Sequence, residues 1–398
     1  MYNNLRLKVI MIKNITSDIK YIGVDDTDLD LFESQYIIPN GIAYNSYLIE
    51  DEKIAIMDSV DARKCDEWLE NLSEALGSRT PDYLIVQHME PDHAGSLEAV
   101  MERYPSLTIV ATARALQMLP QFFEDTNFEG RTLAVKEAET LSLGRHTLQF
   151  FTAPMVHWPE VMVTYDATDK VLFSADGFGK FGALCNEEEW ACEARRYYFN
   201  ICGKYGAPVQ ALLKKAATLD IEIIAPLHGP ILTENLGYYI GLYDTWSRYD
   251  VETKGVFIAC ASIHGGTLAA AEKLAEILRE KGVEKVSVAD LSRDDMAEAI
   301  EDAFRMDRLV VAAASYDGGV FPPMHDFLHH LQIKGYQRRR VGIIENGSWA
   351  PCAARVMSDM LSQMKQIEIV EPMVTIWSRM KRADVAALER LAEALLTK

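Results

Sequence analysis

The chain has 398 residues, of which 49% are hydrophobic and 25% charged, and its formal net charge at pH 7 is −19. This length exceeds what a single hydrophobic core usually supports, so we expect two or three domains. The strong negative charge argues against a nucleic-acid or anionic-membrane surface, because phosphate binding requires a clustered basic face.

Neither a membrane span nor a secretion signal is apparent. The chain has no long uninterrupted apolar run, and residues 1–14 lack the apolar core and cleavage site of a signal peptide. The cysteines form no CxxC pair, so a disulfide framework, a zinc ribbon and a rubredoxin-type iron site are not indicated. We expect reduced thiols and a cytoplasmic protein. The one basic run, Arg338-Arg339-Arg340, is interpreted as a solvated turn before a strand.

The first part of the chain mixes hairpins with helices. Segments 43–50 and 54–60 flank a polar turn and predict a β-hairpin, followed by a helix over 61–76 and a buried strand over 82–88. Further strands are expected within 128–153 and 161–176, and helices around 187–218 and 234–249. This mixture favours an α+β sandwich over a regular βαβ winding.

A polar stretch at 250–254 marks the expected domain boundary, giving domains over 1–250 and 254–398. The second part is more regular, because apolar runs alternate with helical patterns. These runs predict five parallel strands of a doubly wound α/β sheet, at 256–262, 283–291, 308–315, 339–346 and 367–374. His325, His329 and His330 fall on an expected helix and are interpreted as surface or packing residues.

Metal-ligand side chains gather just past several expected strands. His88, Glu90, Asp92 and His93 lie between the strand at 82–88 and a helix expected to begin near Gly95. Taken alone, they are also compatible with a polar turn in which Asp92 caps the helix. Three more strand-end residues, His157, Asp176 and His228, favour a shared site at one sheet edge. Imidazoles and carboxylates without thiolates suit iron, manganese or zinc, and three carboxylates can neutralise much of the charge of two divalent ions and can bridge them, so a dinuclear site is expected.

Three loops of the second part suggest a flavin site. The first, between a strand and a helix, places hydroxyls and glycines where backbone N–H groups can bind a phosphate, although an ordinary βα turn explains it equally well. In a flavodoxin-like sheet all three loops meet around FMN, with Tyr316 and Trp349 against its ring. The expected FMN-binding residues are Ser262, Ile263, His264, Gly265, Gly266, Thr267, Ala314, Ser315, Tyr316, Asp317, Gly318, Gly319, Asn346, Gly347, Ser348, Trp349 and Ala350.

The motif at 88–93 resembles the metallo-β-lactamase pattern His-x-His-x-Asp-His, with Glu90 in place of the second histidine. With the flavodoxin-like second part, the chain resembles the flavodiiron branch of that fold. The resemblance implies an αββα sandwich followed by a flavodoxin-like domain. It further implies one iron bound by His88, Glu90 and His157, a second bound by Asp92, His93 and His228, and Asp176 as a bridge. Tyr198 matches a family tyrosine near the site and is the expected catalytic side chain, or alternatively a helix-face aromatic.

The resemblance implies an oxidoreductase in which FMN feeds a diiron site that reduces O₂ to water or NO to N₂O. Both substrates stay open, because each needs the same open ferrous pair. An external electron donor, rubredoxin or a reduced deazaflavin, and a head-to-tail homodimer, sometimes paired into a tetramer, are expected. Two alternatives remain: a dizinc hydrolase with an accessory flavodoxin domain, and a non-catalytic flavin electron carrier whose metal domain serves for docking.

Overall fold

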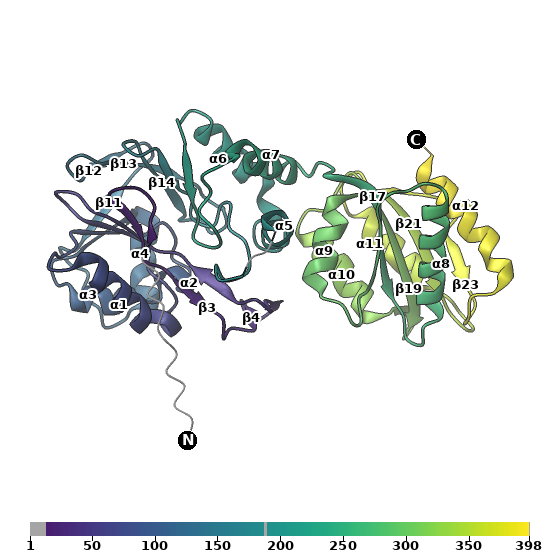
Figure 1. The fold of residues 1–398 in the computed structure, drawn as a ribbon. Coiled ribbons are helices and arrows are strands. Elements are labelled where there is room, and N and C mark those ends of the chain that lie inside the picture. The colour runs from purple at the N-terminus through teal and green to yellow at the C-terminus, as the bar shows by residue number, and fades with distance from the viewer. Residues whose placement is uncertain (1–12, 187–188, 398) are drawn as a thin grey trace, which may run out of the picture. The chain divides into compact units, whose positions relative to one another are not determined.

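The computed structural model describes residues 13–186 and 189–397. Residues 1–12, for which no signal peptide is predicted, and residues 187–188, which open the predicted helical stretch 187–218, lie outside the described residues. The chain divides into two compact units, one of Met1–Tyr197 with Ala207–Gly241, the other of Tyr198–Gly206 with Leu242–Lys398. Figure 1 shows both units.

The first unit contains two large sheets. The strands of the seven-stranded sheet are, in spatial order, β1 (Lys13–Asn14), β2 (Ile19–Tyr21), β7 (Tyr47–Ile49), β8 (Ala55–Met57), β9 (Tyr83–Ile85), β10 (Thr108–Thr112) and β11 (Thr132–Val135). Those of the five-stranded sheet are β12 (Thr140–Ser142), β13 (Thr147–Thr152), β14 (Met162–Asp166), β15 (Val171–Phe173) and β16 (Ile223–Ala225). Two short ladders pair β3 (Val24–Asp26) with β6 (Ile42–Tyr44), and β4 (Leu31–Phe32) with β5 (Tyr36–Ile37).

The two sheets enclose one apolar core. Ile49 and Met57 from the first sheet and Phe150 and Phe173 from the second belong to a single buried cluster. Helices cover the outer faces, namely α1 (Cys65–Leu76), α3 (Leu97–Arg103) and α4 (Ala113–Phe122) on the seven-stranded sheet and α6 (Gly206–Ala216) on the other (Figure 1). The αββα sandwich implied by the family resemblance is therefore confirmed. The first unit also contains η1 (Ala62–Lys64) and α2 (Pro91–Ala94), whereas α5 (Trp190–Ile201) and α7 (Leu236–Ser247) each contribute residues to both units.

The second unit is a doubly wound parallel sheet. Its strands are, in spatial order, β18 (Val286–Asp290), β17 (Thr253–Ala261), β19 (Met306–Tyr316), β21 (Arg340–Asn346) and β22 (Glu368–Ile369). The short strands β20 (Gly319–Val320) and β23 (Val374–Ile376) pair with β19 and β21. The predicted fifth strand is split into β22 and β23, because Pro372 between them has no N–H to donate to a ladder.

Helices pack on both faces of this sheet. On one face α8 (Gly266–Glu280) and α12 (Val385–Leu396) share a buried cluster with Ile258 and Val310. The other face carries α9 (Met296–Arg305), α10 (Pro322–Ile333) and α11 (Ala353–Ser362) (Figure 1). The 3₁₀ turns η2 (Gly203–Tyr205) and η3 (Arg382–Asp384) complete the unit. The predicted flavodoxin-like winding is confirmed.

The basic run at 338–340 corrects the sequence interpretation, since its central residue is not solvated. Arg339 is 3% exposed, and its guanidinium donates hydrogen bonds to the carbonyl oxygens of Phe304 at 2.6 Å, Met306 at 2.8 Å and Tyr249 at 3.0 Å. A guanidinium offers five N–H donors, so it can satisfy several carbonyls that a strand end leaves unpaired. Arg339 thereby fixes residues 249–250 to the second unit.

The remaining sequence expectations concern single residues. All six cysteines are free. His325 and His329 are exposed on α10, and His330 on the same helix is half-buried beside Asp326. Among the described residues, no helix combines the length and the apolar character needed to cross a membrane.

Candidate metal and flavin sites

The segment from Gln87 to His93 is held at the end of β9 by a buried aspartate. Asp58 accepts hydrogen bonds from the Gln87 backbone N–H at 2.8 Å and from the Gln87 side chain at 2.9 Å. Its backbone adopts a left-handed conformation with φ 53°, which is rare for a residue other than glycine, and burial raises its pKa to about 6. A one-turn helix, α2, begins within this segment at Pro91, so Asp92 and His93 lie on its first turn, and the helix expected near Gly95 is α3, whose N-cap is Ser96.

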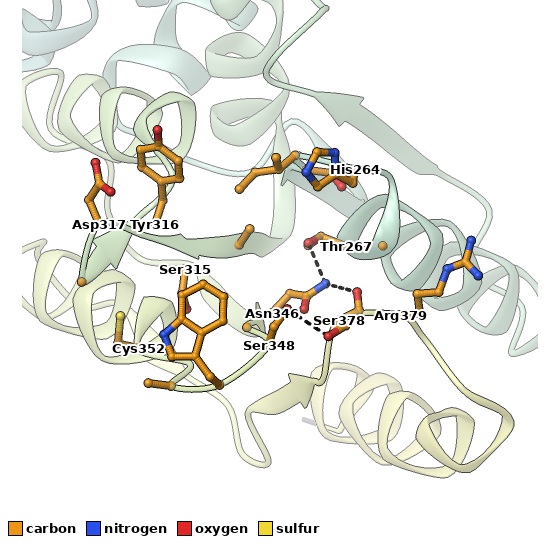
Figure 2. A pocket seen from close by; sticks show the side chains of 18 residues that line it. His264, Thr267, Ser315, Tyr316, Asp317, Asn346, Ser348, Cys352, Ser378 and Arg379 are labelled. Carbon is orange, nitrogen blue, oxygen red and sulfur yellow. Dashed lines mark hydrogen bonds between the residues drawn. The ribbon is translucent and has the colours of Figure 1, made fainter.

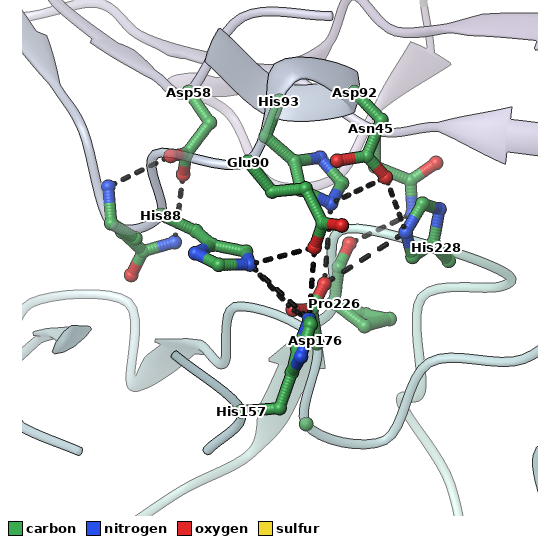
Figure 3. A network of polar contacts seen from close by, with 12 residues as sticks. Asn45, Asp58, His88, Glu90, Asp92, His93, His157, Asp176, Pro226 and His228 are labelled. Carbon is green, nitrogen blue, oxygen red and sulfur yellow. Dashed lines mark hydrogen bonds and ion pairs between the residues drawn. The ribbon is translucent and has the colours of Figure 1, made fainter. Parts of the chain in front are cut away.

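The seven predicted ligands converge in two adjacent groups (Figure 3). The first group contains His88, Glu90 and His157, and Glu90 Oε2 lies 3.1 Å from His88 Nε2 and 2.9 Å from His157 Nε2. The second contains Asp92, His93 and His228, and Asp92 Oδ2 lies 3.2 Å from the Nε2 atoms of both histidines. The grouping is the one that the family resemblance implies.

Asp176 lies between the groups and offers one oxygen to each. Its Oδ2 lies 3.3 Å from the Nε2 atoms of His88 and His157. Its Oδ1 lies 3.2 Å from His93 Nε2 and 3.8 Å from His228 Nε2. Two ligands at ~2.1 Å from a common ion are separated by roughly 3.0–3.4 Å, so these spacings suit two metal ions that share one carboxylate.

Several buried atoms of the site make no well-aligned hydrogen bond with any described residue, although ligand nitrogens lie 3.2 Å from Asp92 Oδ2 and 3.3 Å from Asp176 Oδ2. They are both carboxylate oxygens of Asp92, Oδ2 of Asp176, and Nε2 of His228. Buried polar atoms normally have well-aligned partners, and a cluster of exceptions among imidazoles and carboxylates suits a metal site. The donor set of nitrogen and carboxylate oxygen suits iron, manganese or zinc. The residues therefore fit a pair of such ions.

The electrostatics of the site keep its carboxylates ionised. Burial alone would raise the pKa of Asp176, but the charge of His88 and hydrogen bonds with His157 and His93 hold it well below its usual range. For Glu90, burial has the same opposing effect, and hydrogen bonds with His157 and His88 lower its pKa. Burial would lower the pKa of His157, but hydrogen bonds with Asp176 and Glu90 raise it to about 9. Ionised carboxylates are the form that binds cations.

Two ligand histidines are oriented through their other ring nitrogen. His88 Nδ1 lies 2.8 Å from Oε1 of the buried Glu160, which also accepts the Met89 backbone N–H at 3.0 Å. His228 Nδ1 lies 2.8 Å from the carbonyl oxygen of Ala43. Because these oxygens only accept, each imidazole carries its hydrogen on Nδ1 and presents Nε2 to the cluster. Sequence inspection missed Glu160, although its position three residues after His157 at the same strand end was a usable signal.

Two tyrosines, Tyr44 and Tyr197, have ring contacts with the ligand His228, and Tyr197 is the nearer of the two. Its ring centroid lies 5.5 Å from that of His228, and Phe32 from the β4–β5 hairpin packs edge-on against the same histidine at 5.5 Å. The predicted catalytic residue, Tyr198, instead has ring contacts with Phe199, Tyr243 and Trp246, and its hydroxyl is buried without a partner among the described residues. These ring contacts suit the helix-face aromatic that is the alternative for Tyr198, and its catalytic role stays a prediction.

The second unit contains a cavity of about 690 Å³ at the carboxyl ends of its strands (Figure 2). This volume lies within the usual range for cofactor sites. Every predicted FMN-binding residue lines the cavity except Gly265 and Gly319. Gly265 instead occupies the N-cap of α8 in a left-handed conformation, with φ 80° and no side-chain cap, and Gly319 pairs with Tyr316 in the β19–β20 ladder.

The cavity has a polar end and an aromatic rim. At the polar end the uncapped N-terminus of α8 leaves backbone N–H groups for an anion, and Ser262 Oγ is buried without a partner among the described residues. At the rim Tyr316 is 45% exposed and Trp349 is 87% exposed. A phosphate-bearing molecule with a flat ring fits this distribution.

A fourth loop lines the cavity and was not predicted. Ser378 and Arg379 follow β23, and Cys352 lies at the start of α11. The apolar run predicts a fifth strand that ends at residue 374, whereas β23 ends at Ile376. A strand end at Ile376 places residues 377–379 at the same sheet edge as the other three loops.

Known proteins match both units of the chain. A family model described as ODP family beta lactamase matches residues 42–229. An anaerobic nitric oxide reductase flavorubredoxin of Vibrio vulnificus is 27% identical over 84% of this chain and 70% of its own length. The solved structure of rubredoxin oxygen:oxidoreductase from Desulfovibrio gigas aligns with a TM-score of 0.89 and 25% identity over 96% of this chain and 97% of that one.

The flavodiiron protein of Giardia intestinalis aligns with a TM-score of 0.86 and 22% identity over 97% of this chain and 96% of that one, which supports the fold. A metallo-β-lactamase-like sandwich with a paired ligand cluster, followed by a flavodoxin-like sheet with a flavin-sized cavity, defines a two-site class of protein. Within that class the chain belongs with the flavodiiron proteins, and most of the segment matched by the ODP β-lactamase model lies in its first unit.

Proposed function

We propose that the chain is an oxidoreductase in which FMN, bound in the cavity of the second unit, supplies electrons to two irons that reduce O₂ to water or NO to N₂O. The observation that carries the proposal is Asp176, whose two oxygens face two separate ligand groups. The proposed metal ligands are His88, Glu90 and His157 for one iron and Asp92, His93 and His228 for the other. We keep 1–250 and 254–398 as the diiron and FMN domains.

The names of the related proteins support the choice of substrates. One relative is a rubredoxin oxygen:oxidoreductase and another an anaerobic nitric oxide reductase, so this family acts on both diatomics. We propose that this chain also acts on one or both, and that its electrons come from rubredoxin or a reduced deazaflavin. The reduced thiols support the cytoplasm as its location.

When bound, the cofactors would supply redox chemistry, FMN as a carrier of one or two electrons and the irons as a pair that cycles between Fe(II) and Fe(III). The chain's residues hold and tune that pair. Glu90 adds an anionic oxygen where related hydrolases have a histidine, which favours the ferric state. Asp176 offsets the repulsion between two close cations. Glu160 and the Ala43 carbonyl keep two imidazoles aimed at the site.

Metal and flavin analysis combined with rapid kinetics tests the proposal. Protein expressed and purified without oxygen should carry about two irons and one FMN per chain. After reduction it should be reoxidised by O₂ or NO in a stopped-flow experiment. Stoichiometric zinc without iron would favour the dizinc hydrolase. A protein that contains iron and FMN but is reoxidised by neither gas would favour the non-catalytic electron carrier.

We further propose a head-to-tail homodimer, or a pair of such dimers, in which the FMN of one chain serves the irons of its partner. A two-fold interface is self-complementary and pairs unlike ends of two chains. The test mixes two variants. A His93→Ala chain keeps FMN but has a defective iron site, and a chain carrying Ser262→Ala and Thr267→Val keeps iron but loses FMN. Mixed dimers should recover part of the oxidase activity. Activity no higher than that of the separate variants, in mixtures shown to contain mixed dimers, would refute transfer in trans.

A further inference from the structure

One side chain links three loops of the flavin cavity. Asn346, at the end of β21, is 7% exposed, and its Nδ2 donates one hydrogen bond to the carbonyl oxygen of Ser378 at 3.0 Å and another to Thr267 Oγ1 at 3.2 Å (Figure 2). A carbonyl oxygen can only accept a hydrogen bond, so the atom that faces Ser378 must be the amide nitrogen. This contact fixes which way the amide points.

The orientation of the amide decides whether the Thr267 hydroxyl donates or accepts a hydrogen bond toward Asn346. Because Nδ2 donates to Oγ1, the hydroxyl acts as an acceptor toward Asn346 and keeps its own hydrogen for another acceptor. Thr267 lies on the first turn of α8 and lines the cavity beside Ser262. The hydroxyl of Thr267 is thereby committed as a donor at the polar end of the cavity.

The backbone around Thr267 leaves little room for an alternative arrangement. A Cβ atom at Gly266 would lie 2.3 Å from the carbonyl oxygen of Ser378 and 3.2 Å from Asn346 Nδ2. Ser378 in turn donates from its Oγ to Ser348 Oγ at 2.9 Å. The loop after β23 is therefore packed directly on the loop before α8, with Asn346 bonded to both.

We propose that Asn346 is a positioning residue that holds the Thr267 hydroxyl as a donor toward the flavin phosphate, and that it thereby sets the preference for FMN over riboflavin. A phosphate dianion offers acceptors only, whereas the terminal hydroxyl of riboflavin can donate or accept. A committed donor thus forms a charge-assisted hydrogen bond with the phosphate but only a weaker, neutral one with the riboflavin hydroxyl, and this difference in strength discriminates between them. The inference rests on the proposed function, because it takes the cavity to be the flavin site.

A double-mutant cycle on ligand selectivity tests the inference. Flavin-free, full-length protein is titrated with FMN and with riboflavin, and binding is followed by flavin fluorescence. The measured quantity is the ratio of the two dissociation constants. Asn346→Ala should lower the preference for FMN about tenfold, the size of one charge-assisted hydrogen bond, and Thr267→Val should lower it at least as much. The double variant should match Thr267→Val alone, because Asn346 acts through that hydroxyl.

Thr375→Val is the matched control. Its hydroxyl donates to Glu345 Oε1 at 2.8 Å, and the residue does not line the cavity. Selectivity should stay unchanged in this variant, whereas FMN affinity should fall more than riboflavin affinity in the Asn346 and Thr267 variants. If Asn346→Ala loses riboflavin as well, the cycle is repeated with Asn346→Ser.

The outcomes separate this inference from the proposed function. Wild-type protein that binds neither flavin would refute the function. Wild-type protein that prefers FMN, with an unchanged ratio in Asn346→Ala or with additive effects in the cycle, would overturn the inference alone. Loss of both flavins in both Asn346 variants would also overturn it, since the side chain would then only maintain the fold.

Discussion

Replacing Glu160 with alanine is expected to weaken iron binding at the first ligand group about 10- to 150-fold. Glu160 is 2% exposed, and its Oε1 accepts the Nδ1–H of His88 at 2.8 Å and the Met89 N–H at 3.0 Å. Hydrogen bonds to a charged group contribute about 1.5–3 kcal/mol each. Loss of the hydrogen bond to His88 therefore weakens iron affinity about 10- to 150-fold, because about 1.4 kcal/mol corresponds to a factor of ten.

Glu160→Gln should have a smaller effect. The amide oxygen can still accept both hydrogen bonds, so the tautomer of His88 is retained. The amide NH₂ group would then stand at Oε2, which is buried without a partner among the described residues. The variant therefore loses the charge and gains an unsatisfied donor. We expect an affinity between those of the alanine variant and the wild type.

The assay is iron content per chain after dialysis against increasing concentrations of chelator, with FMN content as an internal reference. Glu137→Gln provides the matched control, since Glu137 lies in the same unit but binds Thr152 and Lys215 near the surface. Thermal unfolding of each variant establishes that the fold persists. If Glu160→Ala kept both irons at the chelator concentrations that the wild type tolerates, the proposed orientation of His88 would be refuted.

Two further changes test other parts of the structure. Asp176→Ala should reduce iron from about two ions per chain to one or none while FMN stays bound, because the bridge is lost and the flavin cavity lies in the other unit; loss of both cofactors would contradict the assignment of the sites. Arg339→Met should lower the free energy of unfolding of the second unit by ~3 kcal/mol, since buried carbonyls lose their donor. The side chain of Arg338 is 40% exposed, so Arg338→Met should lower the free energy of unfolding by less than ~1 kcal/mol. Both variants are measured by urea titration, and equal effects would argue against a stabilising role for the hydrogen bonds of Arg339.

The convergence of the predicted ligand side chains could be foreseen from the sequence, because the signal is carried by the side chains themselves. His157, Asp176 and His228 are each chemically distinctive and each follow an apolar strand, so the rule that strand ends share a sheet edge sufficed to bring them together. Neighbouring residues of one type gave no such guide. Tyr197 and Tyr198 are adjacent residues of the same type, so the sequence does not distinguish them. The direction in which each side chain leaves α5 decides which ring contacts His228.

Long-range burial was not predictable from the local pattern. Arg339 stands in a run of three arginines, which on average indicates a solvated surface. Its burial depends on carbonyls contributed by residues near 249 and 305, far away in the sequence. In a similar way, the end of the fifth strand depends on pairing with β21 beyond Pro372. Both the burial of Arg339 and the end of the fifth strand depend on hydrogen-bond partners that lie elsewhere in the sequence.

The two sites differ in how their chemistry is encoded, and this difference explains why one was easier to define. Both lie at the carboxyl ends of strands. The metal cluster is built from side chains, so the identity of each residue reveals its role. The flavin cavity relies on backbone N–H groups at the start of α8 and on the polarity of hydroxyls, which the residue names leave open. Thr267 becomes a committed donor only because Asn346 faces a carbonyl from a different loop. Assigning function at such a site therefore requires the hydrogen-bond network, since the direction of each bond, rather than the presence of a hydroxyl, determines which ligand is favoured.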